Sequence, residues 1–245
     1  MRFGCTPRRT SQRVTHFIAS SQTVARRIRE CYDRDSIVIY PPVDTEYYSP
    51  IMAPRDDFYL CVSALVPYKR IDLAIDACNR LGRRLIVIGR GPLLRRLRRL
   101  AGPTVSVLGW QSNEVIRDHY RRCRALLFPG HEDFGIVPVE AQACGAPVIA
   151  YGRGGASETV IPTTQSDTGT GQLFAEQSVA GLIDGIREFE SAPHRYSPTL
   201  ARDNTERFAT GNYERQLIAF VEQVVASRQP ALTHPAEPRE LNFAA

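Results

Sequence analysis

The chain has 245 residues, a net charge of +5 and 43% hydrophobic residues, enough to bury a substantial core in one large domain or in one domain with a fragment of another. It contains no run of about eighteen apolar residues and no apolar signal-peptide core in residues 1–20, so we predict neither a membrane-spanning helix nor a secretory signal. Its six cysteines form no C-x-x-C pair, which argues against metal ligation, and Cys61, Cys78 and Cys144 lie in apolar patterns, which indicates small buried side chains in a reducing compartment.

The first part of the chain predicts a short strand, a helix and a second short strand. Residues His16–Tyr32 read HFIASSQTVARRIRECY, a strand followed by a helix with Ser20 or Ser21 as its N-cap. Residues Ser36–Asp57 continue with a short apolar run and then a proline-rich stretch. We therefore expect a structural segment over residues 1–40 and a linker over residues 41–57.

From Tyr59 onward, short β-branched runs alternate with amphipathic runs, a pattern typical of βαβ units on a parallel sheet. The predicted fold class is therefore α/β, and its ligands should bind at the carboxyl ends of the strands, where several glycines follow. The predicted strands are Tyr59–Ala64, Leu85–Gly89, Val105–Gly109, Ala125–Pro129 and Pro147–Ala150. The predicted helices are Lys69–Leu81, Pro92–Ala101, Asn113–Cys123, Gly135–Ala143 and Ala156–Val160.

One of these helices carries a dense group of arginines. Residues Pro92–Leu100 read PLLRRLRRL, which places leucines on one face and arginines on the other. A patch for anionic lipid or nucleic acid is one interpretation. A solvated helix face is favoured, because no aromatic residue is interleaved with the arginines, and we predict no nucleic-acid partner.

The stretch HEDFGIVPVEAQACG (His131–Gly145) places Glu132 and Glu140 on either side of a predicted helix start near Phe134. A strand, a turn and a helix would aim free N–H groups and the positive helix end at one spot, which suits a diphosphate. Ionised carboxylates only accept hydrogen bonds, so beside a sugar nucleotide their natural partners are hydroxyl pairs. The spacing of the two acids taken by itself favours a simpler interpretation, two surface acids on a loop and a helix.

The last part of the chain predicts a helix and a tail. Residues Asp203–Ser227 show helical periodicity through Tyr213, Leu217, Phe220 and Val224. Residues 228–245 contain several prolines and no periodicity, and we expect a disordered tail there.

Several stretches together resemble one known family. They are YLCVSALVPYKRIDLAI (Tyr59–Ile75), LIVIGRGP (Leu85–Pro92), VSVLGWQSNEVIRDHYRRCRALLFPG (Val105–Gly130), the E-x7-E helix, and PVIAYGRGGASETVI (Pro147–Ile161). In order and spacing they resemble the retaining glycosyltransferases of family 4, which have the two-domain GT-B fold, and they cover most of residues 15–225.

The resemblance implies a domain organisation. Residues 58–205 would form the Rossmann-like, nucleotide-sugar-binding domain, which is the C-terminal half of a GT-B fold, and residues 206–227 the helix that crosses back to the N-terminal domain. Residues 1–40 would be a remnant of the N-terminal acceptor domain. The rest of that domain does not precede them, so we expect a truncated chain. The strand at His16–Ser20 should then be an unpaired edge, and transfer by the chain alone should be negligible, because both substrates must be held in register.

The resemblance also implies roles for individual residues. Glu132, near the donor hexose, and Lys69, which matches the diphosphate-binding lysine, would be the catalytic residues, and Glu140 would bind the ribose diol. The family usually has an arginine at the position where this chain has Ala64. Arg70 is a candidate to take over the role of that arginine, with Arg153 as the alternative. The remaining implied donor contacts are the backbone around Phe134, Gly135, Ile136 and Val137, and the glycines Gly89, Gly91 and Gly109.

The implied reaction is the transfer of a hexose, mannose first, from a nucleoside-diphosphate sugar to a saccharide or lipid-linked acceptor with retention, without an essential metal or another cofactor. GDP-mannose is the first expected donor and a UDP-sugar the runner-up. The resemblance implies a cytoplasmic location, with a peripheral contact at the inner face of the membrane.

Two other functions stay open. One is a catalytically incomplete nucleotide-sugar-binding fragment without the acceptor domain. The other is a different Rossmann-like enzyme, such as an epimerase or dehydrogenase. It is disfavoured because the first βα turn reads SALVPYK without G-x-G-x-x-G, and because the chain has no Y-x-x-x-K pair.

Overall fold

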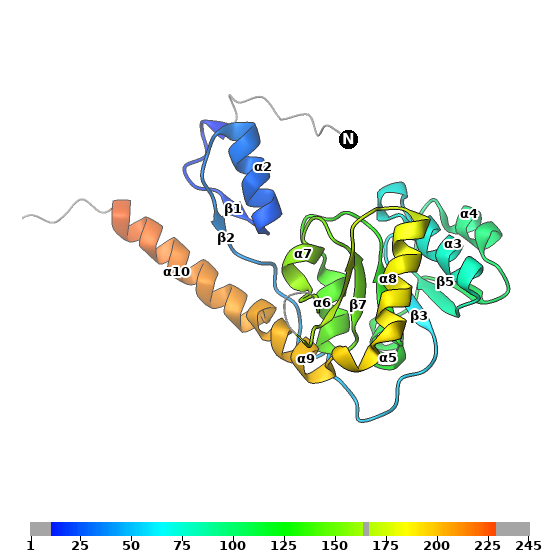
Figure 1. The fold of residues 1–245 in the computed structure, drawn as a ribbon. Helices are drawn as coiled ribbons and strands as arrows, with labels where there is room; N and C mark the ends of the chain where they lie inside the picture. The colour runs from blue at the N-terminus through cyan, green and yellow to red at the C-terminus, as the bar shows by residue number, and fades with distance from the viewer. Residues whose placement is uncertain (1–10, 164–166, 229–245) are drawn as a thin grey trace, which may run out of the picture.

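The computed structural model describes residues 11–163 and 167–228, and its centre is a six-stranded sheet with helices on both faces (Figure 1). Neighbouring strands all pair in parallel, in the order β5-β4-β3-β6-β7-β8, which agrees with the predicted α/β class. The strand bounds are β3 Tyr59–Val62, β4 Leu85–Ile88, β5 Val105–Gly109, β6 Ala125–Phe128, β7 Val148–Tyr151 and β8 Gly171–Phe174.

Five of these strands lie where the sequence predicts them, and β8 is the one that was missed. It reads GQLF, which begins with glycine and has no β-branched residue, so its composition does not favour a strand. Its pairing with β7 defines it, since Val148 lies opposite Gly171 and Tyr151 opposite Phe174.

The sheet is buried on both faces, as expected for parallel strands covered by helices. Successive side chains point to opposite faces, so Tyr59 and Cys61 join one apolar cluster and Leu60 the other. The first cluster includes side chains of α3 (Ile71–Leu81), α4 (Leu94–Leu100) and α8 (Val179–Ser191). The second includes side chains of α5 (Asn113–Arg122), α6 (Ile136–Ala143) and α7 (Ala156–Thr159), and α9 (Pro198–Thr205) packs on α6.

Some predicted helix bounds were wrong, for local backbone reasons. The helix predicted over Lys69–Leu81 begins at Ile71, because Arg70 has a φ of 53° and separates it from a single 3-10 turn, η1 (Pro67–Lys69). The helix predicted over Asp203–Ser227 is interrupted by η3 (Glu206–Phe208) and starts again as α10 (Thr210–Arg228). Helices α8 and α9 were not predicted, and a further 3-10 turn, η2 (Pro193–Arg195), lies between them.

A small unit precedes the sheet domain. It consists of β1 (Ile18–Ala19), α2 (Gln22–Tyr32) and β2 (Ile37–Val38), and Ser21 caps α2 by accepting a hydrogen bond from the Val24 N–H at 3.1 Å. The expected strand and helix, with Ser21 as the cap, are confirmed. The expectation of an unpaired edge strand at His16–Ser20 was wrong, because β1 pairs in parallel with β2.

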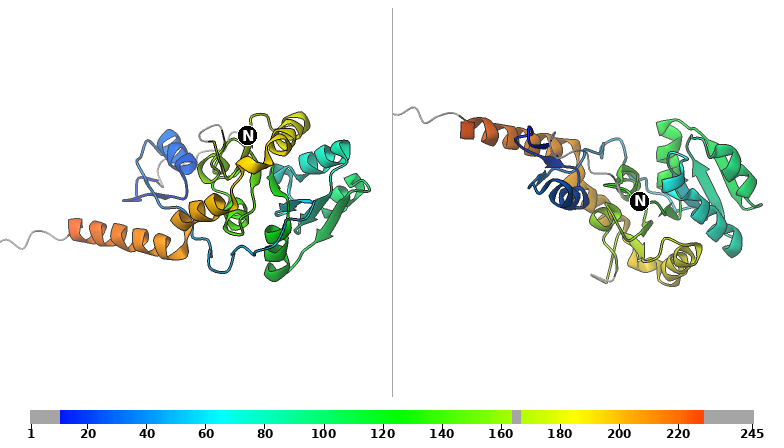
Figure 2. Two further views of the ribbon diagram at one scale, coloured as in Figure 1. Left: turned by 60° about the horizontal axis from the view of Figure 1, so that its bottom comes forward. Right: turned by 90° about the horizontal axis from the view of Figure 1, so that it is seen from above.

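Helix α10 runs away from the sheet and passes beside the small unit (Figure 2). The rings of His16 and Phe220 meet edge to face there, with their centroids 5.8 Å apart. None of the described helices, α10 included, is both long and apolar enough to cross a membrane. The tail predicted over residues 228–245 lies outside the described residues, except for Arg228 at the end of α10.

Candidate functional site

The strand order marks one place on the sheet where a ligand is expected. The chain builds outward from β3 through β4 to β5, and then returns to the other side of β3 to add β6, β7 and β8. The loops that follow β3 and β6 therefore lead away from their shared edge in opposite directions. In open α/β sheets such a switch point opens a crevice at the carboxyl ends of the strands, where ligands bind.

Lys69 and Glu132 meet at this point. Lys69 ends the loop after β3 and Glu132 lies in the loop after β6, and the Lys69 Nζ forms an ion pair with the Glu132 Oε1. The two side chains are only 15% and 18% exposed, so water and salt screen this pair less than a surface pair. The two residues predicted as catalytic from separate motifs thus lie together, although their roles in a reaction stay predictions.

The start of α6 lies just beyond Glu132. Gly135 takes the N-cap position with a φ of 90°, a conformation that favours glycine, and the helix begins at Ile136 instead of at Phe134 or Gly135. The N–H groups of Ile136 and Val137 belong to the first turn, where a helix supplies no backbone partner. These groups and the positive helix end can together bind an anion.

Phe134 fixes this loop to the core. Its side chain is 5% exposed and packs against the rings of Tyr40 and Phe208, at centroid distances of 5.7 and 5.3 Å. The Phe134 side chain is therefore an anchor in the core, and a ligand contact would have to come from its backbone. The donor contacts predicted for the backbone of residues 134–137 stay predictions.

The glycine-rich loop after β7 holds the Glu132 loop in place. The N–H of Gly155 donates to the Glu132 carbonyl oxygen at 2.8 Å, and Gly154 forms a β-bridge with Glu132. A Cβ on Gly155 would lie only 2.1 Å from the Phe134 carbonyl oxygen and 2.2 Å from its Cα. The sequence shows these glycines only as turn residues that could approach a ligand, whereas the structure uses them for contact with a neighbouring loop.

We expect Gly155→Ala to destabilise the protein by about 1–3 kcal/mol or more, because the added methyl group must displace the backbone of Phe134. The free energy of unfolding in urea measures this effect. Gly211→Ala is the matched control, since its added Cβ would meet only the end of the flexible Arg215 side chain, at 3.5 Å. Equal effects of the two substitutions would contradict the close loop contact.

Gly89 and Gly91 serve a similar structural purpose. A Cβ on Gly89 would lie 1.8 Å from the Ser63 carbonyl oxygen, and one on Gly91 would lie 2.5 Å from that of Leu65. Both glycines thus let the loop after β4 pack against the loop that leads to Lys69. The N–H of Gly89 also donates to the Gly109 carbonyl oxygen at 2.8 Å. The contacts predicted between these three glycines and a donor stay predictions.

The Arg70 guanidinium is bound to Asp72, with its Nη2 3.2 Å from the Asp72 Oδ2. The structure therefore gives this arginine a local partner on the first turn of α3. Its predicted role in place of the missing family arginine stays a prediction.

Glu140 lies inside α6 in a separate polar group. Its Oε2 accepts a hydrogen bond from the Tyr120 hydroxyl at 2.9 Å. Burial raises the pKa of the Glu140 carboxyl, and hydrogen bonds from Tyr120 and Tyr48 offset part of that rise. Among the residues that the structure describes, Glu140 forms no hydrogen bond or ion pair with Lys69 or Glu132. Its predicted contact with a ribose stays a prediction, and sequence reasoning missed both tyrosines.

Two carboxylates join the site loops to α2. The Arg27 guanidinium donates to both oxygens of Asp133, at 3.1 and 2.7 Å. Glu158 of α7 accepts from the N–H groups of Gln22 and Thr23, at 2.8 and 2.9 Å, and from the Thr23 hydroxyl at 2.9 Å. The small unit is thus attached directly beside the Glu132 loop.

We expect Glu158→Ala to loosen α2, since hydrogen bonds to a charged group contribute about 1.5–3 kcal/mol each. Hydrogen exchange should become faster in Gln22–Tyr32 and stay unchanged in β3 and β6. Glu214→Ala, which removes an exposed acid from α10, is the control. Unchanged exchange in α2 would show that Glu158 does not hold this helix.

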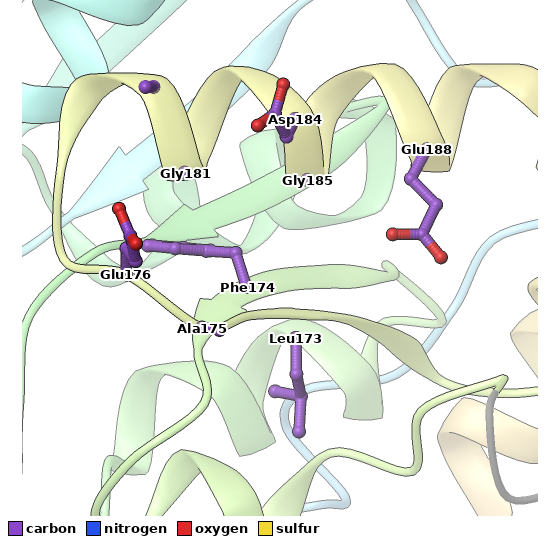
Figure 3. A pocket seen from close by; sticks show the side chains of 9 residues that line it. Leu173, Phe174, Ala175, Glu176, Gly181, Asp184, Gly185 and Glu188 are labelled. Atoms are coloured by element: carbon purple, nitrogen blue, oxygen red, sulfur yellow. The ribbon is translucent and has the colours of Figure 1, made fainter.

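A cavity of about 390 Å³ lies elsewhere, between β8 and α8 (Figure 3). Asp184 and Glu188 project from α8 beside it, and Glu176 comes from the loop after β8. Neither Lys69 nor Glu132 lines it. Three carboxylates would repel a diphosphate, so the switch point remains the better candidate for a nucleotide.

The cysteines that the structure describes are free of disulfides, and Cys61, Cys78 and Cys144 are buried, as expected. Cys123 is also buried, whereas Cys31 is half-buried. Burial raises the pKa of the Cys78, Cys123 and Cys144 thiols to about 12, so these groups stay protonated at neutral pH. Within residues 11–163 and 167–228, no cluster of three or more His, Cys, Asp or Glu side chains is arranged to hold a metal ion.

Comparison with known proteins gives one family. The family model of glycosyl transferases group 1 matches residues 51–207. An uncharacterized glycosyltransferase of Methanocaldococcus jannaschii is 33% identical over 151 residues, which are 59% of this chain and 42% of that protein. A GDP-mannose-dependent alpha-(1-6)-phosphatidylinositol monomannoside mannosyltransferase of Mycobacterium tuberculosis is 30% identical over 177 residues, which are 60% of this chain and 45% of that protein. The chain thus spans less than half the length of these curated relatives.

Solved structures share the fold at lower identity. The Anabaena protein Alr3699/HepE, crystallised with UDP and glucose, matches with a TM-score of 0.75 and 22% identity, over 90% of this chain and 67% of that one. A sucrose-phosphate synthase from Thermosynechococcus elongatus matches with a TM-score of 0.73 and 23% identity, over 86% of this chain and 58% of that one. At these identities the likeness shows the fold alone, and it confirms the predicted Rossmann-like parallel sheet.

Proposed function

Because the chain belongs to the glycosyl transferases group 1 family, of the GT-B superfamily, we propose that it binds a nucleoside-diphosphate sugar and transfers its hexose to a saccharide or lipid-linked acceptor. The observation that carries this proposal is the Lys69–Glu132 pair at the switch point of the sheet, beside the start of α6. It combines a cation and free N–H groups for the diphosphate with a carboxylate for sugar hydroxyls.

In the proposed reaction, Lys69 and the first turn of α6 bind the diphosphate. As the bond between sugar and phosphate breaks, negative charge develops on the leaving diphosphate, and these groups stabilise it. The loss of one such donor typically costs about 3–4 kcal/mol of transition-state stabilisation. Glu132 accepts hydrogen bonds from the hexose, and Glu140 accepts them from the ribose. We propose transfer with retention, as in family 4, without an essential metal.

GDP-mannose is our first candidate for the donor. The similarity to the GDP-mannose-dependent mannosyltransferase of Mycobacterium tuberculosis supports it. A UDP-sugar is the second candidate, supported by the likeness to the Anabaena protein that was crystallised with UDP and glucose. A lipid-linked acceptor would bring the reaction to the inner face of the membrane.

The second candidate function is nucleotide-sugar binding without transfer. The chain spans less than half the length of its curated relatives, and all donor contacts proposed above come from residues 58–205. Transfer also requires acceptor-binding groups that hold the second substrate in register. We therefore propose that such groups come from further polypeptide, and that the chain alone binds its donor but transfers little sugar.

Titration calorimetry with GDP, UDP, GDP-mannose and UDP-glucose tests this proposal. One base should be preferred, and both its diphosphate and its sugar nucleotide should bind. A transfer assay on the same sample separates the two functions. Binding without transfer would support the second, and the absence of binding by all four compounds would contradict both.

A further inference from the structure

The ion pair between Lys69 and Glu132 has a consequence for ligand choice. Lys69 is the only lysine of the chain, and in the structure its ammonium group is neutralised by Glu132. A diphosphate that binds Lys69 therefore competes with the Glu132 carboxylate for the N–H groups of the ammonium. Both side chains are mostly buried, so this carboxylate stays close to the incoming anion and is only weakly screened from it.

The Glu132 backbone cannot move away to relieve this repulsion. Its carbonyl oxygen accepts from the Gly155 N–H at 2.8 Å, and the next residue, Asp133, is held by both guanidinium nitrogens of Arg27. Phe134 is anchored in the core. Only the Glu132 side chain can therefore change its position. A ligand with hydroxyl groups nearby would donate hydrogen bonds to its carboxylate.

The donor and the nucleoside-diphosphate product of a glycosyl transfer differ in the group that would lie beside Glu132. The donor presents hexose hydroxyl groups, which can donate to a carboxylate. The product presents a terminal phosphate in place of the sugar, and at pH 7 that group carries most of a further negative charge, because its second pKa is about 6. A carboxylate held beside the diphosphate favours the first ligand and repels the second.

We propose that Glu132 is a specificity-determining residue that makes the site prefer the sugar nucleotide over the sugar-free nucleoside diphosphate. This inference rests on the proposed function. The carboxylate neutralises Lys69 in the empty site, accepts hexose hydroxyls when the donor is bound, and weakens the binding of the diphosphate product. The arrangement favours exchange of spent nucleotide for fresh donor.

Glu132→Gln separates these effects, because glutamine has a similar shape and no charge. With the nucleotide that the wild-type chain prefers, calorimetry should show at least tenfold tighter binding of the nucleoside diphosphate and weaker binding of its sugar nucleotide. Glu214→Gln is the matched control, since it makes the same chemical change at an exposed side chain of α10, which has no part in the proposed site. The control should change both affinities by the same small factor.

A second measurement uses the wild-type chain and does not depend on the folding of a variant. The methyl ester of the nucleoside diphosphate has the charge of the donor but no sugar hydroxyls, and it should bind more tightly than the free diphosphate. Glu132→Gln should abolish that difference. Equal binding of ester and diphosphate by the wild-type chain, or a parallel change of both affinities in Glu132→Gln, would overturn the inference. Failure of the wild-type chain to bind any of these nucleotides would instead contradict the proposed function.

Discussion

Replacing Lys69 with alanine is expected to lower the affinity for the nucleoside diphosphate by about ten- to a hundredfold and to leave the affinity for the nucleoside unchanged. A hydrogen bond to a charged group contributes about 1.5–3 kcal/mol, and each 1.4 kcal/mol is a factor of about ten in Kd. The substitution also leaves Glu132 without its cation, so the site becomes more negative where the diphosphate should bind. Titration calorimetry with both ligands measures the difference.

The salt dependence of this loss is part of the prediction. It should shrink at high ionic strength, because part of the attraction between Lys69 and the diphosphate is screened. Arg99→Ala removes one positive charge from the exposed side of α4 and is the control, with little effect on either ligand. Equal losses for nucleoside and diphosphate in Lys69→Ala would mean that the lysine acts on the base or on folding.

Glu140→Gln should weaken nucleotide binding to a similar extent, because a ribose diol would lose its charged acceptor. The 2′,3′-dideoxynucleotide provides the comparison, since it lacks both hydroxyls and its affinity should not respond to the substitution. An unchanged affinity for the ordinary nucleotide would remove Glu140 from the site.

The same substitution should not destabilise the protein at neutral pH. Burial raises the pKa of the Glu140 carboxyl, so the folded state holds its proton more tightly than the unfolded chain does. Stability from this group is therefore greatest at low pH and falls as the pH rises above the ordinary carboxyl value of 4.5. Glutamine keeps an acceptor for the Tyr120 hydroxyl without the buried charge. Between pH 5 and pH 8, the free energy of unfolding in urea should fall more for the wild type than for Glu140→Gln. A larger fall in the variant would contradict this expectation.

The sequence predicts the fold class well because the parallel sheet has a strong local signal. Runs such as LIVI in β4 and ALLF in β6 are apolar throughout, and they are separated by helical patterns and glycines. β8 lacks this signal, since GQLF becomes a strand only through its pairing with β7. The break at Arg70 has no local signal either, because a positive φ is unusual for arginine.

The site was only partly predictable for a similar reason. Lys69 and Glu132 each belong to a recognisable motif, but their contact depends on β3 and β6 being neighbours, which no local pattern specifies. The contacts of Tyr120 with Glu140 and of Arg27 with Asp133 join segments 20 and 106 positions apart, and they depend on side-chain directions that only the packed structure defines.

The most direct test of a nucleotide site at the switch point is a crystal structure of this chain with the nucleoside diphosphate that it binds best. We predict that the diphosphate lies at the carboxyl ends of β3 and β6, within hydrogen-bonding distance of the Lys69 Nζ and the first turn of α6, with Glu132 turned away from Lys69. A nucleotide bound in the cavity between β8 and α8, with the Lys69–Glu132 pair intact, would contradict the account.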